Sequence, residues 1–314
     1  MAYFLKEIND AVRSDPQGFV QESDALYAKK IESAAKKIRD NLKNSRIVLL
    51  SGPSGSGKTT TAKKIEAKLE EMGINSHAVS MDNYFRTVDP ETAPRNREGQ
   101  IDYESPFCMD MDLLNQHFAA LDRGERILIP KFEFARQMRS DIKSQPLQLG
   151  RDEIAIFEGI HALNDIITGR NPAAAKVYIS ARSDFLGDGG EVAFKRTWLR
   201  LERRTVRDAK FRAWKADVTV RMWANVRRGE KLYISPFKDN ASIMFDSTLP
   251  YEVSVIRAFA QPLFDHLRVS PDMDRYEEVH QLAAAYPLFD ILDESFVAPD
   301  SLIREFIGGG IYDD

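Results

Sequence analysis

Cysteine is almost missing from this chain. Cys108 is the single one among 314 residues, so no disulfide can form within the chain, and we expect Cys108 to be a small buried side chain rather than a reactive thiol. No apolar run approaches the roughly 20 residues that a membrane-spanning helix needs. The N-terminal stretch MAYFLKEINDAV carries acids too early for a signal peptide. The sequence therefore predicts a soluble, cytoplasmic protein without a membrane partner.

An excess of one charge is also missing. The chain has 44 Lys and Arg against 48 Asp and Glu, for a net charge of −4. This balance argues against a protein that coats nucleic acid, but it leaves room for a local basic cleft that binds a small anion. With 43% hydrophobic residues the chain is typical of a globular protein, and its length suits one large α/β domain or two modest ones.

Short apolar segments alternate with amphipathic ones along the chain. Residues 1–44 read as an N-terminal helical extension, in which Tyr27, Ile31 and Ala34 recur at helical spacing. The main domain, 45–314, ends in a mainly helical part, 250–314, and contains an irregular stretch at 83–110. Strands are predicted at 46–50, 74–82, 127–134 (continuous, or broken at Pro130), 153–159, 176–180 and 243–247, and helices at 58–72, 111–124 and 191–229. This alternation predicts a doubly wound, mainly parallel α/β sheet.

Residues 52–59, GPSGSGKT, follow the first predicted strand and fit the P-loop pattern G-x-x-x-x-G-K-[ST]. Glycines let backbone N–H groups turn inward around phosphate oxygens, and the start of the next helix adds a positive dipole. Lys58 is expected to reach the β- and γ-phosphates and Thr59 to ligate Mg²⁺. We therefore expect ATP and Mg²⁺ as cofactors, with the nucleotide bound by Gly52, Ser54, Gly55, Ser56, Gly57, Lys58, Thr59 and Thr60.

Three classes of P-loop protein are open at this point: kinases, switch GTPases and motor ATPases. The chain has neither the N-K-x-D motif that reads guanine nor the LSGGQ motif of ABC-type ATPases. These absences favour transfer of a phosphoryl group to a small acceptor.

Two acidic residues follow predicted strands, where ligand-binding residues gather in an open α/β sheet. Asp82, in MDNYFR, can accept the proton of an acceptor hydroxyl and lie near Mg²⁺. Glu158, in FEGIHALN, suits a magnesium-holding carboxylate. We assign His161 no catalytic role, because a loop or helix-cap position explains it.

The segment 196–214, RTWLRLERRTVRDAKFRAW, is the candidate lid. Arg196, Arg200, Arg204 and Arg207 fall near one helical face with Arg203 adjacent, and only Glu202 and Asp208 offset the positive charge of 196–212. A solvated basic face is the alternative. Planar guanidinium groups match phosphate oxygens, so we favour a lid over the phosphates.

Several segments together carry a family likeness: GPSGSGKTT, MDNYF, DYESP, PKFEF, FEGIHALN and RLERRTVRD. In this order they resemble the uridine kinase/phosphoribulokinase group of P-loop kinases, and most of all bacterial uridine kinase-like nucleoside kinases. The similarity continues through VRRGEKLYISPF, IMFDSTLPYE and SLIREFIGGG, so that it covers about residues 45–310.

The resemblance implies a role for each matching position. Asp82 would be the general base on the ribose 5′-hydroxyl and lie beside the metal that Thr59 and Glu158 hold. Arg204 and Arg207 would be catalytic residues of the lid, together with Lys58 of the P-loop. Tyr84 and Phe85 would border the acceptor pocket, and Glu104 stands where relatives usually place an aspartate that binds the ribose hydroxyls.

The chain departs from uridine–cytidine kinases around the base. Those enzymes place a tyrosine and a histidine where this chain has Phe132 and Gln137, while Phe134 agrees as an aromatic residue. Phenylalanine can stack on a base but cannot donate a hydrogen bond.

The sequence thus predicts a nucleoside kinase, with a nucleoside-like small molecule as its partner and uridine as the first acceptor to test. A kinase for a non-nucleoside sugar or vitamin alcohol is one alternative. A nucleotide-responsive binding protein with slow hydrolysis is another. The oligomeric state stays open, a homo-oligomer included.

Overall fold

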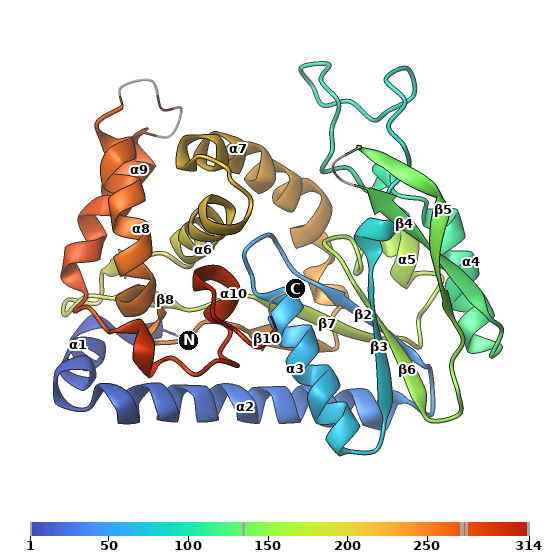
Figure 1. Cartoon of the computed structure of the whole chain (residues 1–314), viewed down its shortest axis with the longest axis horizontal. Helices are drawn as coiled ribbons and strands as arrows, with labels where there is room; N and C mark the ends of the chain where they lie inside the picture. The colour runs from blue at the N-terminus through green and yellow to red at the C-terminus, as the bar shows by residue number, and fades with distance from the viewer. Residues whose placement is uncertain (1, 134–135, 271–272, 274–275, 313–314) are drawn as a thin grey trace.

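A parallel sheet of five strands, in the order β10-β7-β2-β6-β3, forms the centre of the molecule (Figure 1). The computed structural model describes residues 2–133, 136–270, 273 and 276–312. The strands are β2 (Ile47–Ser51), β3 (Asn75–Ser80), β6 (Glu153–Glu158), β7 (Ala175–Ser180) and β10 (Ile243–Asp246), and each pairing between neighbours is parallel. The predicted mainly parallel α/β architecture is confirmed.

The central strand β2 has a continuous run of apolar residues rather than an alternation of apolar and polar ones, and its position in the sheet explains this pattern. All five of its residues are buried, and it pairs with β6 on one side and β7 on the other. A strand covered on both faces needs apolar side chains in both directions. The P-loop follows this strand, so the middle of the sheet positions the loop.

The second of the two N-terminal helices packs against the P-loop helix. Helix α1 spans Leu5–Ser14, and the long α2 spans Pro16–Asn41 along the base of the molecule (Figure 1). Helix α3, Lys58–Glu71, lies against α2. The Tyr27 hydroxyl lies 2.7 Å from the Thr61 hydroxyl oxygen, and Thr61 donates a 2.6 Å hydrogen bond to the carbonyl of Gly57. Helix α2 therefore steadies the first turn of the P-loop helix.

We expect Tyr27→Phe to lower the free energy of unfolding by about 1 kcal/mol, because one buried hydrogen bond is lost while the ring stays packed. Urea unfolding measures this change. Tyr103→Phe is the matched control: Tyr103 is 56% exposed, and its loss of a hydroxyl should leave the unfolding midpoint unchanged. Equal midpoints for the two variants would contradict the role given to the Tyr27 hydroxyl.

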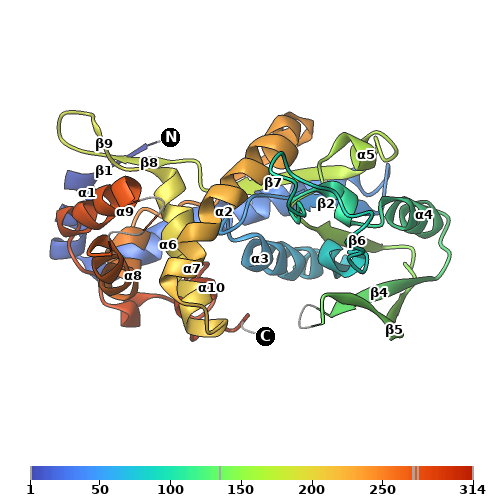
Figure 2. The same ribbon diagram turned by 90° about the horizontal axis from the view of Figure 1, so that it is seen from above.

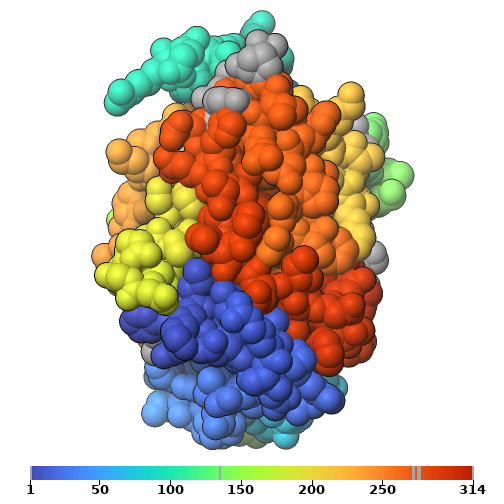
Figure 3. Space-filling view, turned by 90° about the vertical axis from the view of Figure 1, so that its left-hand side faces the viewer, coloured from blue at the N-terminus to red at the C-terminus, as the bar shows by residue number. Residues whose placement is uncertain are grey.

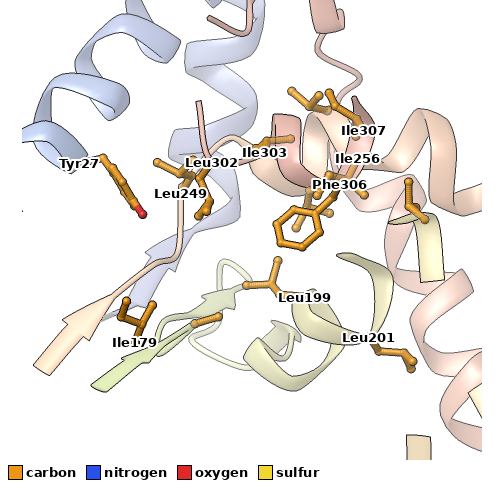
Figure 4. Close-up of a cluster of buried hydrophobic side chains, with 14 of the residues drawn as sticks. Tyr27, Ile179, Leu199, Leu201, Leu249, Ile256, Leu302, Ile303, Phe306 and Ile307 are labelled. Carbon is orange, nitrogen blue, oxygen red and sulfur yellow. The ribbon is translucent and has the colours of Figure 1, made fainter. Parts of the chain in front are cut away.

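The second half of the chain is mainly helical. Helices α6 (Arg196–Phe211) and α7 (Ala216–Gly229) lie between the sheet and the later helices α8 (Glu252–Arg268) and α9 (Tyr276–Ala285) (Figure 2). The C-terminal part also packs against the N-terminal helices (Figure 3). Leu199, Ile256 and Phe306 meet in a buried apolar cluster, and Phe306 belongs to the short helix α10 (Arg304–Ile307) (Figure 4).

Several strands were not predicted from the sequence. A small sheet joins β1 (Ala2–Phe4), β8 (Asp184–Leu186) and β9 (Val192–Phe194). The predictions of helix at 2–4 and 192–194 were therefore wrong, because β1 gains its partner only from β8, far along the chain. A hairpin joins β4 (Ile127–Glu133) to β5 (Met138–Leu147), with a register shift after Pro130. Strand β5 is mostly exposed and polar, so no apolar pattern marked it.

The stretch between β3 and α4 (Met111–Asp122) is mostly irregular, as predicted, with two short 3-10 turns, Met81–Tyr84 and Pro106–Cys108. Cys108 is buried and free, which agrees with the expected packing role. A four-residue helix, α5 (Asp165–Thr168), follows β6. In the part of the chain that the structure describes, no helix has both the length and the apolar character that a bilayer crossing requires.

Candidate active site

The P-loop forms a tight turn between β2 and α3. Gly55 and Gly57 have φ values of 73° and 78°, in the left-handed region that glycine adopts without strain. A Cβ atom added to Gly52 would lie 2.0 Å from the carbonyl oxygen of Ile179, so only glycine fits there. The Lys58 amine folds back to the carbonyl of Pro53 at 3.3 Å. The first turn of α3, which follows the loop, carries backbone N–H groups that have no acceptor within the helix itself.

A cavity of about 230 Å³ lies in front of the P-loop. It gathers residues from the ends of three parallel strands and from two later helices, as expected at the carboxyl edge of such a sheet. Asp82 follows β3, Glu158 ends β6, and helix α6 and its end add Arg207 and Arg212. The lining residues are Ser54, Gly55, Gly57, Lys58, Thr59, Asp82, Glu158, Gly159, Ile160, Arg207, Arg212 and Glu305.

The charges in this cavity are coupled. Burial raises the pKa of Asp82, and the positive charge of Lys58 opposes the shift. Burial likewise raises the pKa of Glu158, again opposed by Lys58 and reinforced by Asp82. Burial lowers the pKa of Lys58, while Glu158, Glu305 and Asp82 raise it. The cavity is therefore a poorly solvated site in which a lysine lies among carboxylates, the setting in which proton acceptors are usually found.

The residues predicted to hold Mg²⁺ would suit that ion if the phosphates of the nucleotide supplied further ligands. Thr59, Asp82 and Glu158 all line the cavity and offer only oxygen ligands, which Mg²⁺ prefers. Within the described residues, no cluster of three or more His, Cys, Asp or Glu side chains forms a complete metal cage. Mg²⁺ commonly keeps several waters and binds through one or two carboxylates together with substrate phosphates, so an incomplete protein shell suits it.

One buried carboxylate holds three arginines of α6 and its end in place. Asp208 is fully buried in α6 and lies 3.3 Å from Arg204, 3.1 Å from Arg207 and 3.4 Å from Arg212. Arg204 also donates a 2.8 Å hydrogen bond to the hydroxyl of Ser54 in the P-loop. A shared anchor fixes these guanidinium groups before any phosphate arrives, which reduces the ordering cost of binding.

The other arginines of α6 have different environments, so the helix does not present one uniform basic face. Arg203 is fully buried, pairs with Glu252 and donates to the carbonyl of Gly55 at 3.3 Å. Arg200 is buried beside Glu230 at 2.6 Å. Arg196 and Arg200 line a separate cavity of about 260 Å³ on the other side of the P-loop, next to Pro53. The charge count of the sequence could not separate these roles, because each depends on partners in distant segments.

Apart from Asp82, the described residues that were predicted to bind the acceptor lie outside the lining of this cavity. Glu104 is half-buried; burial raises its pKa, and Arg204 opposes that shift. Tyr84 is fully buried, with its hydroxyl 2.9 Å from Nδ1 of His117. The ring of Phe132 packs 5.6 Å from that of Phe85, and Gln137 is exposed at the turn after β4. The predicted contact of Phe134 lies outside the described residues.

An ion pair between a buried carboxylate and a half-buried arginine ties the Glu104 segment to the end of α7. The Asp102 carboxylate is 2% exposed and accepts bonds from Arg228 at 2.8 and 3.2 Å and from the Tyr233 hydroxyl at 2.8 Å. Gly229 lies so close to Glu104 that a Cβ atom there would be 2.5 Å from the Glu104 Cβ. We name Asp102, Arg228 and Tyr233 the loop–α7 clasp.

Sequence reasoning missed this clasp and the place of Arg212 and Glu305 in the cavity. Arg212 could have been found from the basic tract that contains it. Asp102 lies in the quoted segment DYESP and Glu305 in SLIREFIGGG, but neither segment indicated the partner of its carboxylate. His161 is buried beside the backbone of Tyr233 and Glu104, and burial lowers its pKa to about 4. The ring is therefore neutral near pH 7, in keeping with the structural role expected for it.

A P-loop, a strand-end carboxylate and anchored arginines around one cavity define a P-loop phosphotransferase. The Phosphoribulokinase / Uridine kinase family matches residues 47–254, more than half of the chain, and the chain belongs to that family. It is thus a member of a family of small-molecule kinases, for which ATP is the usual donor and Mg²⁺ the usual metal.

One relative and two solved structures illustrate what this chain is similar to. A uridine kinase of Staphylococcus aureus (strain JH9) is 28% identical over 204 residues, 65% of this chain and 88% of that protein. A putative fructose transport system kinase from Silicibacter sp. TM1040 aligns over 68% of this chain and 98% of its own, with 20% identity and a TM-score of 0.49. A possible uridine kinase from Bacillus stearothermophilus covers 69% and 98%, with 18% identity and a TM-score of 0.45.

Proposed function

We propose that this protein is an ATP- and Mg²⁺-dependent nucleoside kinase that phosphorylates the 5′-hydroxyl of a uridine-like nucleoside. The products are the nucleoside monophosphate and ADP. The observation that carries the proposal is the position of Asp82, which lines the same cavity as Lys58, Thr59 and Arg207. A kinase requires a proton acceptor beside its phosphate site. A nucleotide-binding protein that has no acceptor substrate does not require one.

Each residue has a defined part in the transfer. The P-loop N–H groups and Lys58 bind the β- and γ-phosphates, and Asp82 accepts the proton of the acceptor hydroxyl as its oxygen attacks the γ-phosphorus. The bond from that phosphorus to the bridging oxygen breaks, and ADP leaves. Arg204, Arg207 and Arg212 neutralise charge on the transferring group. Thr59, Asp82 and Glu158 would hold Mg²⁺, which supplies further neutralisation of phosphate charge.

The acceptor side supports a nucleoside through one acid and one aromatic residue. Glu104 would bind the ribose hydroxyls, because it stands where relatives usually place an aspartate with that role; Arg204 and Asp82 both influence its pKa. Phe132 is 5% exposed and packs against Phe85, and the open part of its ring would contact the base without reading it by hydrogen bonds. The similarity to a protein named uridine kinase adds weight to this choice.

An ADP-release screen tests the proposal. Purified protein, Mg²⁺ and ATP are incubated with each of a set of nucleosides, sugars and vitamin alcohols, and ADP is measured against a sample without acceptor. We expect a nucleoside, with uridine tested first, to raise ADP release, and the product to be the 5′-monophosphate. Glu104→Gln should raise the KM of that acceptor about tenfold and leave the KM of ATP unchanged, since one charge-assisted hydrogen bond is weakened.

Two outcomes would replace the proposal by an alternative. Release that responds only to sugars or vitamin alcohols would identify another acceptor class. Slow release that is independent of every acceptor would identify a nucleotide-responsive protein.

A further inference from the structure

The C-terminal helix α10 places a carboxylate on the P-loop helix. The Oε2 atom of Glu305 accepts a hydrogen bond from the backbone N–H of Thr60 at 3.2 Å and another from the Thr60 hydroxyl at 2.8 Å. Thr60 is the third residue of α3, so its N–H has no partner within the helix. An anion of the chain itself therefore occupies a donor that the helix start would otherwise offer to a ligand.

This position belongs to the phosphate site. Backbone N–H groups at the start of a P-loop helix bind phosphate oxygens of a nucleotide. Glu305 lines the phosphate cavity and also an adjoining cavity of about 300 Å³, to which Thr60, Phe211 and Tyr312 contribute. Both cavities share Thr59, Arg207 and Arg212. A triphosphate in front of the P-loop would meet the Glu305 carboxylate at Thr60.

The backbone that carries Glu305 is fixed. Ile303, Phe306 and Ile307 are at most 1% exposed and lie in the buried cluster shown in Figure 4. Leu302 packs on the P-loop so closely that a Cβ atom at Gly57 would be 2.4 Å from its Cδ1. The helix cannot withdraw without opening this core, so only the side chain of Glu305 can move when a ligand arrives.

We propose that the Glu305 carboxylate occupies part of the donor site until the donor nucleotide displaces it from Thr60. The nucleotide's phosphate takes over the Thr60 N–H and hydroxyl, and the carboxylate turns toward Arg207 and Arg212, which line the same cavities. Glu305 thereby lowers donor affinity, and it lies outside the family match of 47–254. The inference rests on the proposed function only in taking a nucleoside triphosphate as donor.

A purely structural role makes a different prediction. A carboxylate at a helix start also stabilises the helix, whether or not a ligand ever binds there. In that case, loss of the charge at Glu305 would lower stability and leave nucleotide affinity unchanged. Affinity and stability must therefore be measured on the same variants.

The experiment is calorimetric titration of the full-length protein with Mg²⁺–ATP and Mg²⁺–ADP, without acceptor, for the wild type, Glu305→Gln, Glu305→Asp and Asp300→Asn. We expect Glu305→Gln to bind about tenfold more tightly, because the competing charge-assisted bonds become weaker neutral ones. Glu305→Asp keeps the charge but is one methylene too short to reach Thr60 from a fixed backbone, so it should also bind more tightly, by about threefold.

Asp300→Asn is the matched control. Asp300 lies on the same segment and pairs with Lys64 at 2.6 Å, outside the lining of both cavities, so its loss of charge should leave affinity unchanged. Unfolding midpoints show whether each variant folds.

Three results would overturn the inference. Unchanged or weaker binding by Glu305→Gln would show a structural contact only. Tighter binding by Glu305→Gln with wild-type binding by Glu305→Asp would show a general charge effect and no displacement from Thr60. Absence of nucleotide binding by every protein would overturn both this inference and the kinase proposal, whereas a failed acceptor screen with the expected affinities would leave this inference supported.

Discussion

Replacement of Asp82 by asparagine should lower kcat by about a thousandfold while the Kd of ATP stays within about threefold of the wild type, because a positioned general base contributes roughly 10²- to 10⁴-fold. The geometry behind this expectation is the position of Asp82 directly after β3, facing Lys58 and Glu158 across one cavity. Coupled ADP-release assays give kcat, and calorimetry without acceptor gives the Kd.

The pH profile provides a second readout for the same residue. Burial raises the pKa of Asp82, and only its ionised form can accept a proton. The wild-type rate should therefore fall as the pH drops through this raised pKa, and the residual activity of Asp82→Asn should lack that acidic limb. Asp89 lies in an exposed part of the irregular segment that follows Asp82. Asp89→Asn should therefore retain the wild-type rate and pH profile. A kcat within tenfold of the wild type for Asp82→Asn would remove Asp82 as the base.

The second large effect concerns Lys58. Lys58→Ala should lower kcat/KM for ATP by about a thousandfold, as expected when a positioned charge is removed from a developing anion. The amine is also the nearby positive charge that opposes the raised pKa values of Asp82 and Glu158. Its loss should therefore shift the acidic limb of the remaining activity to higher pH, since both carboxylates would then hold their protons more strongly.

The control for Lys58 lies on the same helix. Lys68 pairs with Glu71 on the surface of α3 at 2.5 Å, and Lys68→Ala should leave kcat/KM unchanged. Steady-state kinetics over a range of ATP concentrations compares the two variants. Equal activity of Lys58→Ala and the wild type would mean that the P-loop does not bind the donor.

The sheet and the donor half of the site could be predicted because their signals are local. GPSGSGKT fixes the loop after β2 by glycine conformation and the position of one lysine, and the apolar segment before Glu158 marks a strand covered on both faces. Asp82 was found in the same way, from its place after a strand. Each of these inferences needed no more than a dozen consecutive residues.

The rest depends on partners far apart in the sequence. Asp102 and Arg228 are separated by 126 residues, and Thr60 and Glu305 by 245. The arginines of α6 look alike in sequence, yet Arg203 is buried with Glu252 while Arg204 reaches Ser54. Strand β5 carried no apolar alternation because most of its residues are exposed. No single-sequence pattern encodes such pairings.

The loop–α7 clasp couples two parts of the structure that are far apart in the sequence. Asp102 joins the segment that carries Glu104 to the end of α7, which packs against α6 and its arginines. Any shift of these helices relative to the sheet would therefore move Glu104 with them. In the proposed nucleoside kinase, opening for product release and loosening of the ribose contact would then be one motion, and the acceptor would not be held firmly while the phosphate side stands open.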